Sequence, residues 1–371
     1  MAGRRSCMSA AMETQSQSRL LASVRGFVRS LVEDICNGRS PSVALDRYRT
    51  FCSDPFGNCA CSFDTPFAKE FISIGRQPQA AHRLAVLLRV LSIIQLLLQQ
   101  NKHASKRDIF YMDPALFVDQ AVVDHIINDI CVLLRCSRHH LNVVIFDSLS
   151  LLVMGWLRFK ESDRTISCIK NPNTEHPIPV CLEDVEDMVS VAQYILVVEK
   201  ETVFQRLAND KFCDRNRCIV ITGRGYPDVP TRRFLRHLVE HLRLPVYGLV
   251  DSDPYGFDIL TTYRFGSMQM AYDAKLMRVP EMRWLGVLPS DFEEFNLPDR
   301  CLLNLTPEDK RKAEAMLSRC YLIKDAPQWR TELEMMLHKG VKFEIEALSA
   351  ISFAFLSEVY IPTKIERGKH I

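Results

Sequence analysis

The sequence predicts a multidomain α/β protein whose second half contains a parallel, Rossmann-like sheet. Three apolar runs of strand length support this prediction, at residues 194–198, 218–222 and 246–250. Each run ends on a polar or glycine residue and leads into a stretch with helical patterning. Ligands of such sheets bind outside the carboxyl ends of the strands. The residues that follow the three runs are therefore the first candidates for a functional site.

Acidic residues follow two of these runs. Glu199 follows the first run, and Asp251 and Asp253 follow the third, just before Pro254 and Gly256 turn the chain. Parallel strands end at the same edge of a sheet, so we expect the three carboxylates to converge. Three hard oxygen ligands suit Mg²⁺ or Mn²⁺ better than zinc. Taken alone, the Asp pair also fits a simple strand-to-turn junction, because Asp is common there.

Length and composition set limits on the architecture. With 371 residues the chain exceeds one ordinary core, which favours two domains. The net charge is +2, so any nucleic-acid surface must be local. Thirteen cysteines, an odd number at irregular spacing, predict free thiols in a reducing compartment. Cys52, Cys59 and Cys61 lie close together but lack paired Cys-x-x-Cys spacing, so a metal site is not favoured there.

Residues 1–79 are predicted to form an N-terminal extension. The first 18 or so are polar and are expected to be unstructured, with no secretory pattern. Apolar residues from Leu20 to Ile35 then recur at helical spacing, and Gly38 ends the predicted helix. This amphipathic helix either packs on its own chain or docks a partner. The most apolar stretch, 84–98, is expected to be too short and too polar to span a membrane, which predicts a soluble intracellular protein.

Residues 80–168 follow the order of a winged-helix domain. Helices are predicted at 81–100, 106–112 and 120–134, and the apolar runs 141–146 and 151–157 are expected to pair as a β-ribbon. Three helices and a two-stranded wing form a DNA-docking variant of helix-turn-helix. Residues 169–182, rich in Pro and Asn, are predicted to be a linker. Residues 183–371 would form the α/β domain, with later helices at 307–320 and 343–359.

Five motifs resemble those of one family. The order strand, Glu, helix, strand, Gly, helix, strand, Asp-x-Asp is similar to Toprim domains. Together with the helical motif that ends in Phe110-Tyr111, it resembles the A subunit of type IIB topoisomerases (topoisomerase VI) and its eukaryotic relatives, the meiotic DNA double-strand-break proteins. The resemblance covers about residues 80–371, and its motifs are Ala104–Tyr111, Val197–Phe204, Thr222–Asp228, Asp251–Gly256 and Tyr263–Ser267.

The resemblance implies that Tyr111 is the nucleophile. Its phenol would attack a backbone phosphate and leave a 5′-phosphotyrosyl link and a free 3′-hydroxyl. A phenol is a weak nucleophile at neutral pH, and Arg107, one helical turn earlier, matches the family's catalytic arginine. Without the resemblance, Tyr111 would be interpreted as a packing residue.

The resemblance also implies a metal site and DNA contacts. Glu199, Asp251 and Asp253 match the Toprim ligands of Mg²⁺, with Mn²⁺ as a substitute, and Glu201 is the rival carboxylate in the first motif. Three further residues are predicted to contact double-stranded DNA, namely Lys106, Arg224 and Tyr226. A purely structural turn remains an alternative for the last two.

The implied assembly is larger than one chain. In this family the tyrosine of one protomer meets the metal site of another, which implies a homodimer or a pair with a paralogous A-type chain. The sequence has no Gly-x-x-x-x-Gly-Lys-Ser/Thr loop, so the resemblance implies that a topoisomerase VI B-like subunit supplies ATP binding. The apolar stripe from Leu20 to Ile35 corresponds to the region by which relatives of this chain bind that B-like subunit. Meiotic accessory proteins and a nuclear location, on meiotic chromosomes, follow from the same resemblance.

Other interpretations and one departure stay open. A Toprim nuclease or primase would use the same acids without the tyrosine, and a non-catalytic scaffold would use neither. The sequence His237-Leu-Val-Glu240-His241 matches a zinc-peptidase pattern, although solvated residues on an amphipathic helix explain it more simply. Ser150-Leu151 stands where the meiotic relatives usually have Lys-Gly, which predicts a weaker phosphate contact at the wing.

Overall fold

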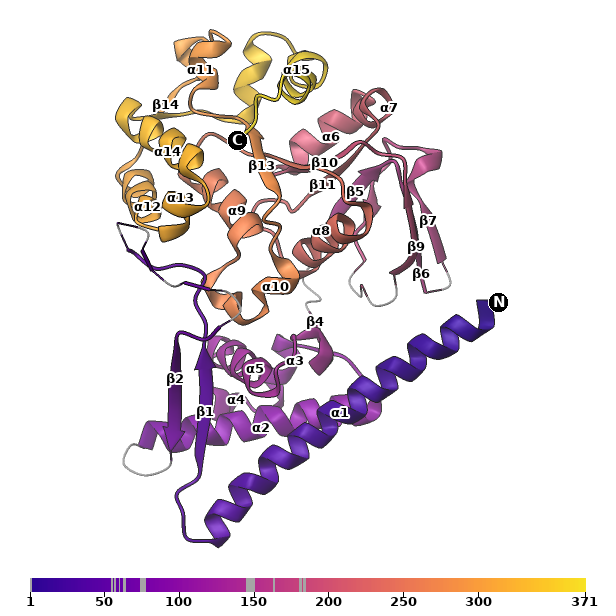
Figure 1. Cartoon of the computed structure of the whole chain (residues 1–371), viewed down its shortest axis with the longest axis vertical. Helices are drawn as coiled ribbons and strands as arrows, with labels where there is room; N and C mark the ends of the chain where they lie inside the picture. The colour runs from indigo at the N-terminus through magenta and orange to yellow at the C-terminus, as the bar shows by residue number, and fades with distance from the viewer. Residues whose placement is uncertain are drawn as a thin grey trace. The chain divides into compact units, whose positions relative to one another are not determined.

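A computed structural model describes residues 2–54, 56, 58–59, 61–62, 65–73, 78–144, 151–162, 164–179, 182 and 185–371. The chain divides into two compact units (Figure 1). The first unit comprises Met1–Arg49 and Phe63–Asp147, and the second comprises Thr50–Ser62 and Ser148–Ile371. The segment 50–62 therefore belongs to the second unit, although the chain on both sides of it belongs to the first.

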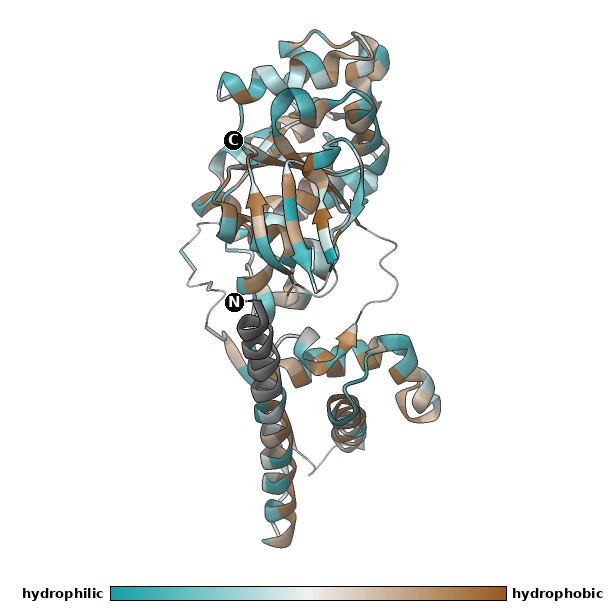
Figure 2. Ribbon diagram, turned by 90° about the vertical axis from the view of Figure 1, so that its right-hand side faces the viewer, coloured by the Kyte–Doolittle hydropathy of each residue, from teal (hydrophilic) through white to brown (hydrophobic). Residues whose placement is uncertain are grey.

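The first unit consists mainly of helices. The predicted helices are confirmed as α2 (Pro78–Gln100), α3 (Lys106–Met112) and α5 (Gln120–Leu134), with a short α4 (Pro114–Phe117) between the last two. The strands β1 (Ser42–Arg47) and β2 (Ala68–Ser73) form an antiparallel pair. Helix α1 (Ala2–Cys36) begins at Ala2, so the prediction of an unstructured start is wrong. Figure 2 shows teal and brown residues interleaved along the part of this helix that is coloured by hydropathy.

Helix α2 is the central apolar helix of the first unit. It is long and apolar enough to cross a membrane by length and composition alone, which contradicts the prediction that it is too short and too polar. The core helix of a soluble protein passes the same test. Residues along its middle, including Leu87, Val90, Leu91 and Ile94, are fully buried within the protein. This burial is typical of a core helix.

The second unit contains the predicted sheet. Its strand order is β13-β12-β10-β11-β5-β8, and β10, β11, β12 and β13 run parallel. The three predicted strands are confirmed as β10 (Tyr194–Val198), β11 (Cys218–Thr222) and β12 (Val246–Leu249), and β13 spans Met282–Gly286. Helices α6 (Glu201–Asn209), α8 (Val229–Leu242) and α9 (Pro254–Phe265) follow these strands in turn.

Helices pack against both faces of the large sheet, which explains why its strands are apolar throughout. Along β10, Ile195 and Val197 pack in a core that includes residues of α8 and α9. The alternate residues Leu196 and Val198 pack in a second core with residues of α6. A strand buried on both faces reads as a continuous apolar run, without the alternation of a half-exposed strand.

The predicted β-ribbon of the wing is wrong. Strand β4 (Val143–Val144) pairs with β3 (Ala104–Ser105) in the first unit, whereas β5 (Leu152–Gly155) pairs antiparallel with β11 in the second. All four residues of β5 are buried, which suits a covered sheet better than an exposed wing. Residues 145–150, including Ser150, lie outside the described residues. Leu151 is buried in the core of the second unit, so it does not belong to a wing.

The predicted boundaries at 168 and 182 also differ from the structure. Strands β6 (Leu157–Glu161) and β7 (Arg164–Ser167) form a three-stranded sheet with β9 (Val185–Ser190), in the second unit. Within the predicted linker, β8 (His176–Pro177) pairs with β5 at the edge of the large sheet. Proline is tolerated at such an edge because a ladder hydrogen bond is not required there. The described part of 169–182 is thus part of the second unit.

The end of the chain wraps back toward the sheet. The helices predicted at 307–320 are α12 (Pro307–Leu317) and the start of α13 (Cys320–Lys324). The single helix predicted at 343–359 is wrong, because a 3₁₀ turn (Ile345–Ala350) and a π-helical turn (Phe355–Tyr360) precede α15 (Ile361–Glu366). The remaining elements are α7 (Phe212–Asn216), α10 (Ala274–Met277), α11 (Asp291–Glu294), α14 (Pro327–Lys339), β14 (Leu303–Asn304) and β15 (Val341–Lys342).

Candidate active site

Three carboxylates meet at the carboxyl end of the large sheet, and we call Glu199, Asp251 and Asp253 the acidic edge. Glu199 directly follows β10, and Asp251 lies two residues beyond β12. Because Val198 pairs with Leu249, the two strands end at the same level. The backbone N–H of Asp251 donates to Oε2 of Glu199 at 2.9 Å. The structure therefore brings these acids together as the sequence predicted.

The other two acids are also held in place by backbone groups. Oδ1 of Asp253 accepts from the backbone N–H groups of Tyr255 and Gly256, at 2.9 and 2.7 Å, and thereby caps α9. Oδ1 of Asp251 accepts from the backbone N–H of Ile345 at 2.9 Å. This bond holds the start of the 3₁₀ turn against the acidic edge.

Burial and like charge perturb two of the acids. Burial, with the charges of Asp251 and Asp253 next, raises the pKa of Glu199 to about 7. Burial is also the main cause that raises the pKa of Asp251 to about 6, although Lys200 and the N–H of Ile345 oppose it. Carboxylates that share a buried site resist full ionisation unless a cation compensates their charge. The site thus favours a bound cation at neutral pH.

Lys200 supplies part of that positive charge and was not predicted from the sequence. Its Nζ lies 2.9 Å from Oδ2 of Asp251 and 2.9 Å from carboxylate oxygens of Glu344 and Glu346. Burial alone would lower the pKa of Lys200, but its hydrogen bonds to these acids raise it. Both glutamates come from a distant part of the chain, so only the position of Lys200 next to Glu199 could have indicated a role.

The acidic edge offers oxygen ligands of the kind that divalent cations bind. Mg²⁺ is usually held by one or two carboxylates and completes its octahedron with water and substrate phosphates. Among the described residues, the acidic edge is not one of the groups whose ligand atoms all lie within 4.8 Å of one another. Glycine at position 256 lets the start of α9 lie close to the acids, because a Cβ there would lie 3.0 Å from Oε2 of Glu199 and 2.5 Å from the carbonyl of Asp251. Three carboxylates that do not form a closed cage suit a divalent cation that keeps some of its water ligands.

The candidate nucleophile lies on a short, well-capped helix of the first unit. Ser105 and Asp108 form a capping box at the start of α3, and Ile109 is fully buried. Tyr111 is 68% exposed, and its ring meets the ring of Phe110 edge-on at 5.3 Å. Arg107, one turn earlier, is also exposed. Tyr111 is therefore available to a ligand and is not a core packing residue.

The predicted DNA-binding residues all lie near acids. Lys106 forms an ion pair with Asp124 in the first unit, with Nζ and Oδ1 2.9 Å apart. Arg224 follows β11 and forms an ion pair with Glu201. Glu201, the alternative metal ligand of the first motif, is thus paired with an arginine. The N–H of Gly225 donates to the carbonyl of Glu199 at 2.9 Å, so this turn lies beside the acidic edge.

Tyr226 belongs to a small polar network in the second unit. It is half exposed, and its hydroxyl donates to Oδ2 of Asp258 at 2.8 Å. Lys312 contacts that hydroxyl and the same carboxylate oxygen, at 3.1 and 2.8 Å. Neither Asp258 nor Lys312 was predicted, because their spacing in the sequence carries no motif.

The residues of the zinc-peptidase pattern, His237, Glu240 and His241, lie on the surface of helix α8. Glu240 binds Arg236 one turn earlier on α8, at 2.8 Å. The rings of His237 and His241 lie 4.0 Å apart on the same face. Within the described part of the chain, these residues are not a group that gathers three ligand atoms within 4.8 Å.

The raised pKa values predict a dependence of stability on pH in metal-free protein. Glu199 holds its proton up to a pH of about 7 when folded, against an ordinary value of 4.5. The folded state therefore binds more protons than the unfolded state in this window, and stability falls as pH rises through it. We expect Glu199→Gln to remove only the part of this fall that Glu199 causes, because Asp251 also has a raised pKa, and to stabilise metal-free protein at pH 8 by roughly 2 kcal/mol.

The measurement is thermal unfolding between pH 4.5 and 8 in the presence of a chelator, with Glu314→Gln on an exposed part of α12 as the control. Added Mg²⁺ at pH 8 should raise the melting temperature of the unaltered chain more than that of Glu199→Gln. Identical pH profiles for the unaltered chain and Glu199→Gln would refute this account of the acidic edge.

Comparisons with known proteins agree with this architecture. Residues 194–365 match the family model for the Toprim domain of Spo11 and of the topoisomerase 6 A subunit, and residues 82–143 match the one described as "Type IIB DNA topoisomerase". The chain is 64% identical to meiotic recombination protein SPO11-1 of Oryza sativa subsp. japonica, over 95% of this chain and 93% of the relative.

More distant relatives extend the same picture. The chain is 36% identical to meiotic recombination protein SPO11 of Homo sapiens, over 95% of this chain and 89% of the relative. It is 40% identical to the A subunit of DNA topoisomerase 6 of Arabidopsis thaliana, over 78% of this chain and 67% of the relative. The chain therefore belongs to the family of type IIB DNA topoisomerases that comprises Spo11 and the topoisomerase 6 A subunit.

Proposed function

We propose that this chain makes DNA double-strand breaks in meiosis, as a topoisomerase-like transesterase with Tyr111 as its nucleophile. Membership of the family and the names of its meiotic relatives support the reaction class. The observation that carries the assignment of the nucleophile is the exposure of Tyr111 on a capped helix, one turn after Arg107. A purely structural tyrosine would be expected to pack.

The chemistry follows from these groups. The phenolic oxygen of Tyr111 attacks the phosphorus, its proton leaves to water, and the bond to the 3′-oxygen of the neighbouring nucleotide breaks. The product is a 5′-phosphotyrosyl link with a free 3′-hydroxyl. The guanidinium of Arg107 stabilises the phenolate and the pentavalent phosphate. When bound, Mg²⁺ would stabilise charge on the 3′-oxygen.

Glu199 and Asp251, the buried pair, would hold that ion together with Asp253. Their raised pKa values support this role, because the ion would supply the positive charge that the buried pair lacks. Lys200 binds Asp251 and keeps its carboxylate oriented. Mn²⁺ has the same preference for oxygen ligands and is the expected substitute.

The reaction requires a second A-type chain and a DNA-binding surface. We infer that Tyr111 of one chain acts with the acidic edge of another, in a homodimer or with a paralogous chain. Arg224, Tyr226 and Lys106 would contact the DNA backbone, each exchanging a carboxylate partner for phosphate. The helical part of the first unit would dock DNA as in winged-helix proteins, without the ribbon predicted at 141–157.

We further infer a topoisomerase VI B-like partner, meiotic accessory proteins and a nuclear location. Helix α1 supports the first of these. Leu20, Val24 and Leu31 of its apolar stripe are buried, whereas Val32 and Ile35 are more than half exposed. The stripe therefore packs on its own chain and still leaves apolar surface that a partner helix could cover.

A Toprim nuclease is the second candidate, because the acidic edge alone would serve hydrolysis equally well. The two reactions differ in their product. Hydrolysis leaves no protein on the DNA, whereas transesterification leaves a covalent adduct.

The central test of the proposal is whether a covalent adduct between the protein and DNA forms. We expect the chain, with its B-like partner, duplex DNA and Mg²⁺, to form a denaturation-resistant link to 5′ ends. Tyr111→Phe should lower the yield by at least about 10³-fold, because the only change is loss of the attacking oxygen. The measurement is gel analysis of end-labelled DNA after denaturation, with and without protease.

Tyr272→Phe, which removes a tyrosine hydroxyl in the second unit, serves as the matched control and should retain the adduct. Breaks that persist in Tyr111→Phe and carry no protein would favour the nuclease. An adduct that Tyr111→Phe still forms would show that another residue is the nucleophile.

The proposed contact of Arg224 predicts a change in salt dependence. Arg224→Ala should weaken duplex binding at all sequences and reduce the slope of log affinity against log salt by about 1, because one phosphate contact is lost. The control is Arg311→Ala, which removes an exposed arginine that is paired with Glu308 on α12. Equal slopes for both variants and the unaltered chain, in a fluorescence titration over a range of salt, would exclude this contact.

A double variant, Ser150→Lys with Leu151→Gly, would not test the predicted weaker phosphate contact cleanly. Because Leu151 is buried, a glycine there would remove core contacts as well as any effect on DNA. Ser150→Lys alone is the variant that isolates the proposed phosphate contact.

A further inference from the structure

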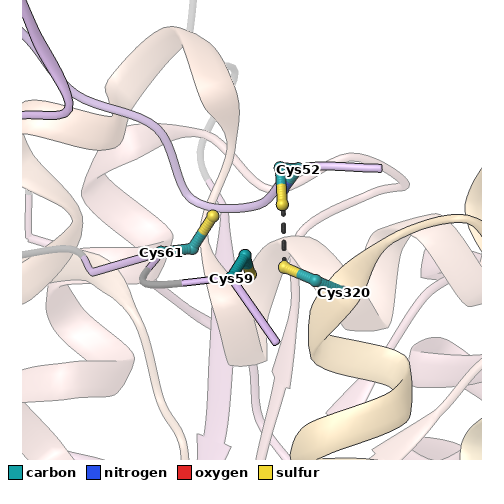
Figure 3. Close-up of side chains that lie close together, drawn as sticks. All are labelled: Cys52, Cys59, Cys61 and Cys320. Atoms are coloured by element: carbon teal, nitrogen blue, oxygen red, sulfur yellow. Dashed lines mark hydrogen bonds between the residues drawn. The ribbon is translucent and has the colours of Figure 1, made fainter. Parts of the chain in front are cut away.

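Four cysteines that are scattered in the sequence gather at one place in the second unit (Figure 3). Cys52, Cys59 and Cys61 come from the segment 50–62, and Cys320 is the first residue of α13. Their sulfur atoms all lie within 4.8 Å of one another. Cys320 is buried and the other three are half-buried. The prediction against a metal site at Cys52, Cys59 and Cys61 rested on spacing alone and did not include this fourth thiol.

We propose that these four cysteines bind one structural Zn²⁺ ion. A tetrahedral Cys₄ site with Zn–S bonds of about 2.3 Å places its sulfur atoms about 3.8 Å apart, so only a small contraction of the present cluster is needed. Each thiol gives up its proton to solvent when it binds the metal. A closed set of four sulfur ligands, with no position left for water or substrate, is the pattern of a structural site and not of a catalytic one.

The surroundings already provide hydrogen bonds and positive charge for bound thiolates. The backbone N–H of Cys52 donates to Sγ of Cys320 at 3.4 Å, and a dashed line joins these two residues in Figure 3. The N–H of Cys320 donates to the carbonyl of Cys52 at 3.0 Å, so the two ligand-bearing backbones are paired. Nζ of Lys324 lies 3.3 Å from Sγ of Cys59. A lysine at that place offsets part of the negative charge of a zinc tetrathiolate.

The segment is positioned by packing as well as by the cysteines. The ring of Phe51 meets that of Tyr321 edge-on at 5.6 Å, and the guanidinium of Arg319 lies 4.7 Å from the centre of the Phe51 ring. Both partners flank Cys320 in the sequence. Zinc would fix the rest of the segment, through Cys59 and Cys61, to the same short helix.

The connectivity gives this site a structural consequence. The segment 50–62 joins two stretches of chain that both belong to the first unit, yet it is part of the second. A metal bound by these four cysteines, all of which belong to the second unit, would hold both ends of the segment 50–62 to α13. We therefore expect zinc to contribute to the stability of the whole chain and not to the chemistry of cleavage.

The test is the metal content of the full-length chain, purified under reducing conditions without chelators. Mass spectrometry of the metals should find about one zinc per chain, and Cys59→Ser should lower this content to less than about a tenth. Cys301→Ser is the matched control, because Cys301 is another half-buried cysteine of the second unit outside the cluster. It should leave the zinc content unchanged.

Two further measurements do not depend on the folding of Cys59→Ser. Cys59→His should retain zinc, since Cys₃His is also a common structural set. A strong chelator should lower the melting temperature of the unaltered chain and of Cys301→Ser, but not that of Cys59→Ser. Reduced protein without zinc, or the four cysteines recovered as two disulfides by mass spectrometry, would overturn the proposal.

Discussion

The hydrogen bond from the backbone of Asp251 to the carboxylate of Glu199 is the contact on which the candidate site depends. It exists because β10 and β12 are parallel neighbours that end at the same level, so the residues beyond them must meet. The same geometry places two negative charges in a partly buried position. That position is unfavourable for charged acids by itself, and it becomes favourable only when a cation is present. Lys200 meets this need in part, and a divalent ion would complete it.

The two kinds of functional group are supported in different ways. The acids follow strands that are buried on both faces, and backbone N–H groups fix their orientation. Tyr111 instead lies exposed on a seven-residue helix, which a capping box and the buried Ile109 hold in place. A metal site benefits from a rigid frame, whereas a nucleophile that must reach DNA has to be on the surface. In the proposed assignment, each requirement is met by a different compact unit.

The parts of the fold that were predicted correctly are those governed by local pattern. The runs at 194–198, 218–222 and 246–250 could be interpreted as buried strands, and the acids that follow them as neighbours, without knowing any distant contact. Pairing between distant segments could not be predicted in this way. Strand β5 looks like half of a ribbon in the sequence, but its partner β11 lies more than sixty residues away. The contacts of Lys200 with Glu344 and Glu346, and the place of Cys320 beside Cys52, were missed for the same reason.

The most direct measurement of the central claim is complementation between two inactive chains. Tyr111→Phe and Glu199→Gln homodimers should both fail to cleave. If the tyrosine of one protomer works with the acidic edge of its partner, their mixed dimer has one intact composite site. It should nick a single strand and become linked to it through the Glu199→Gln chain. A mixture that forms mixed dimers on duplex DNA but makes no nick, or links through the other chain, would contradict the account.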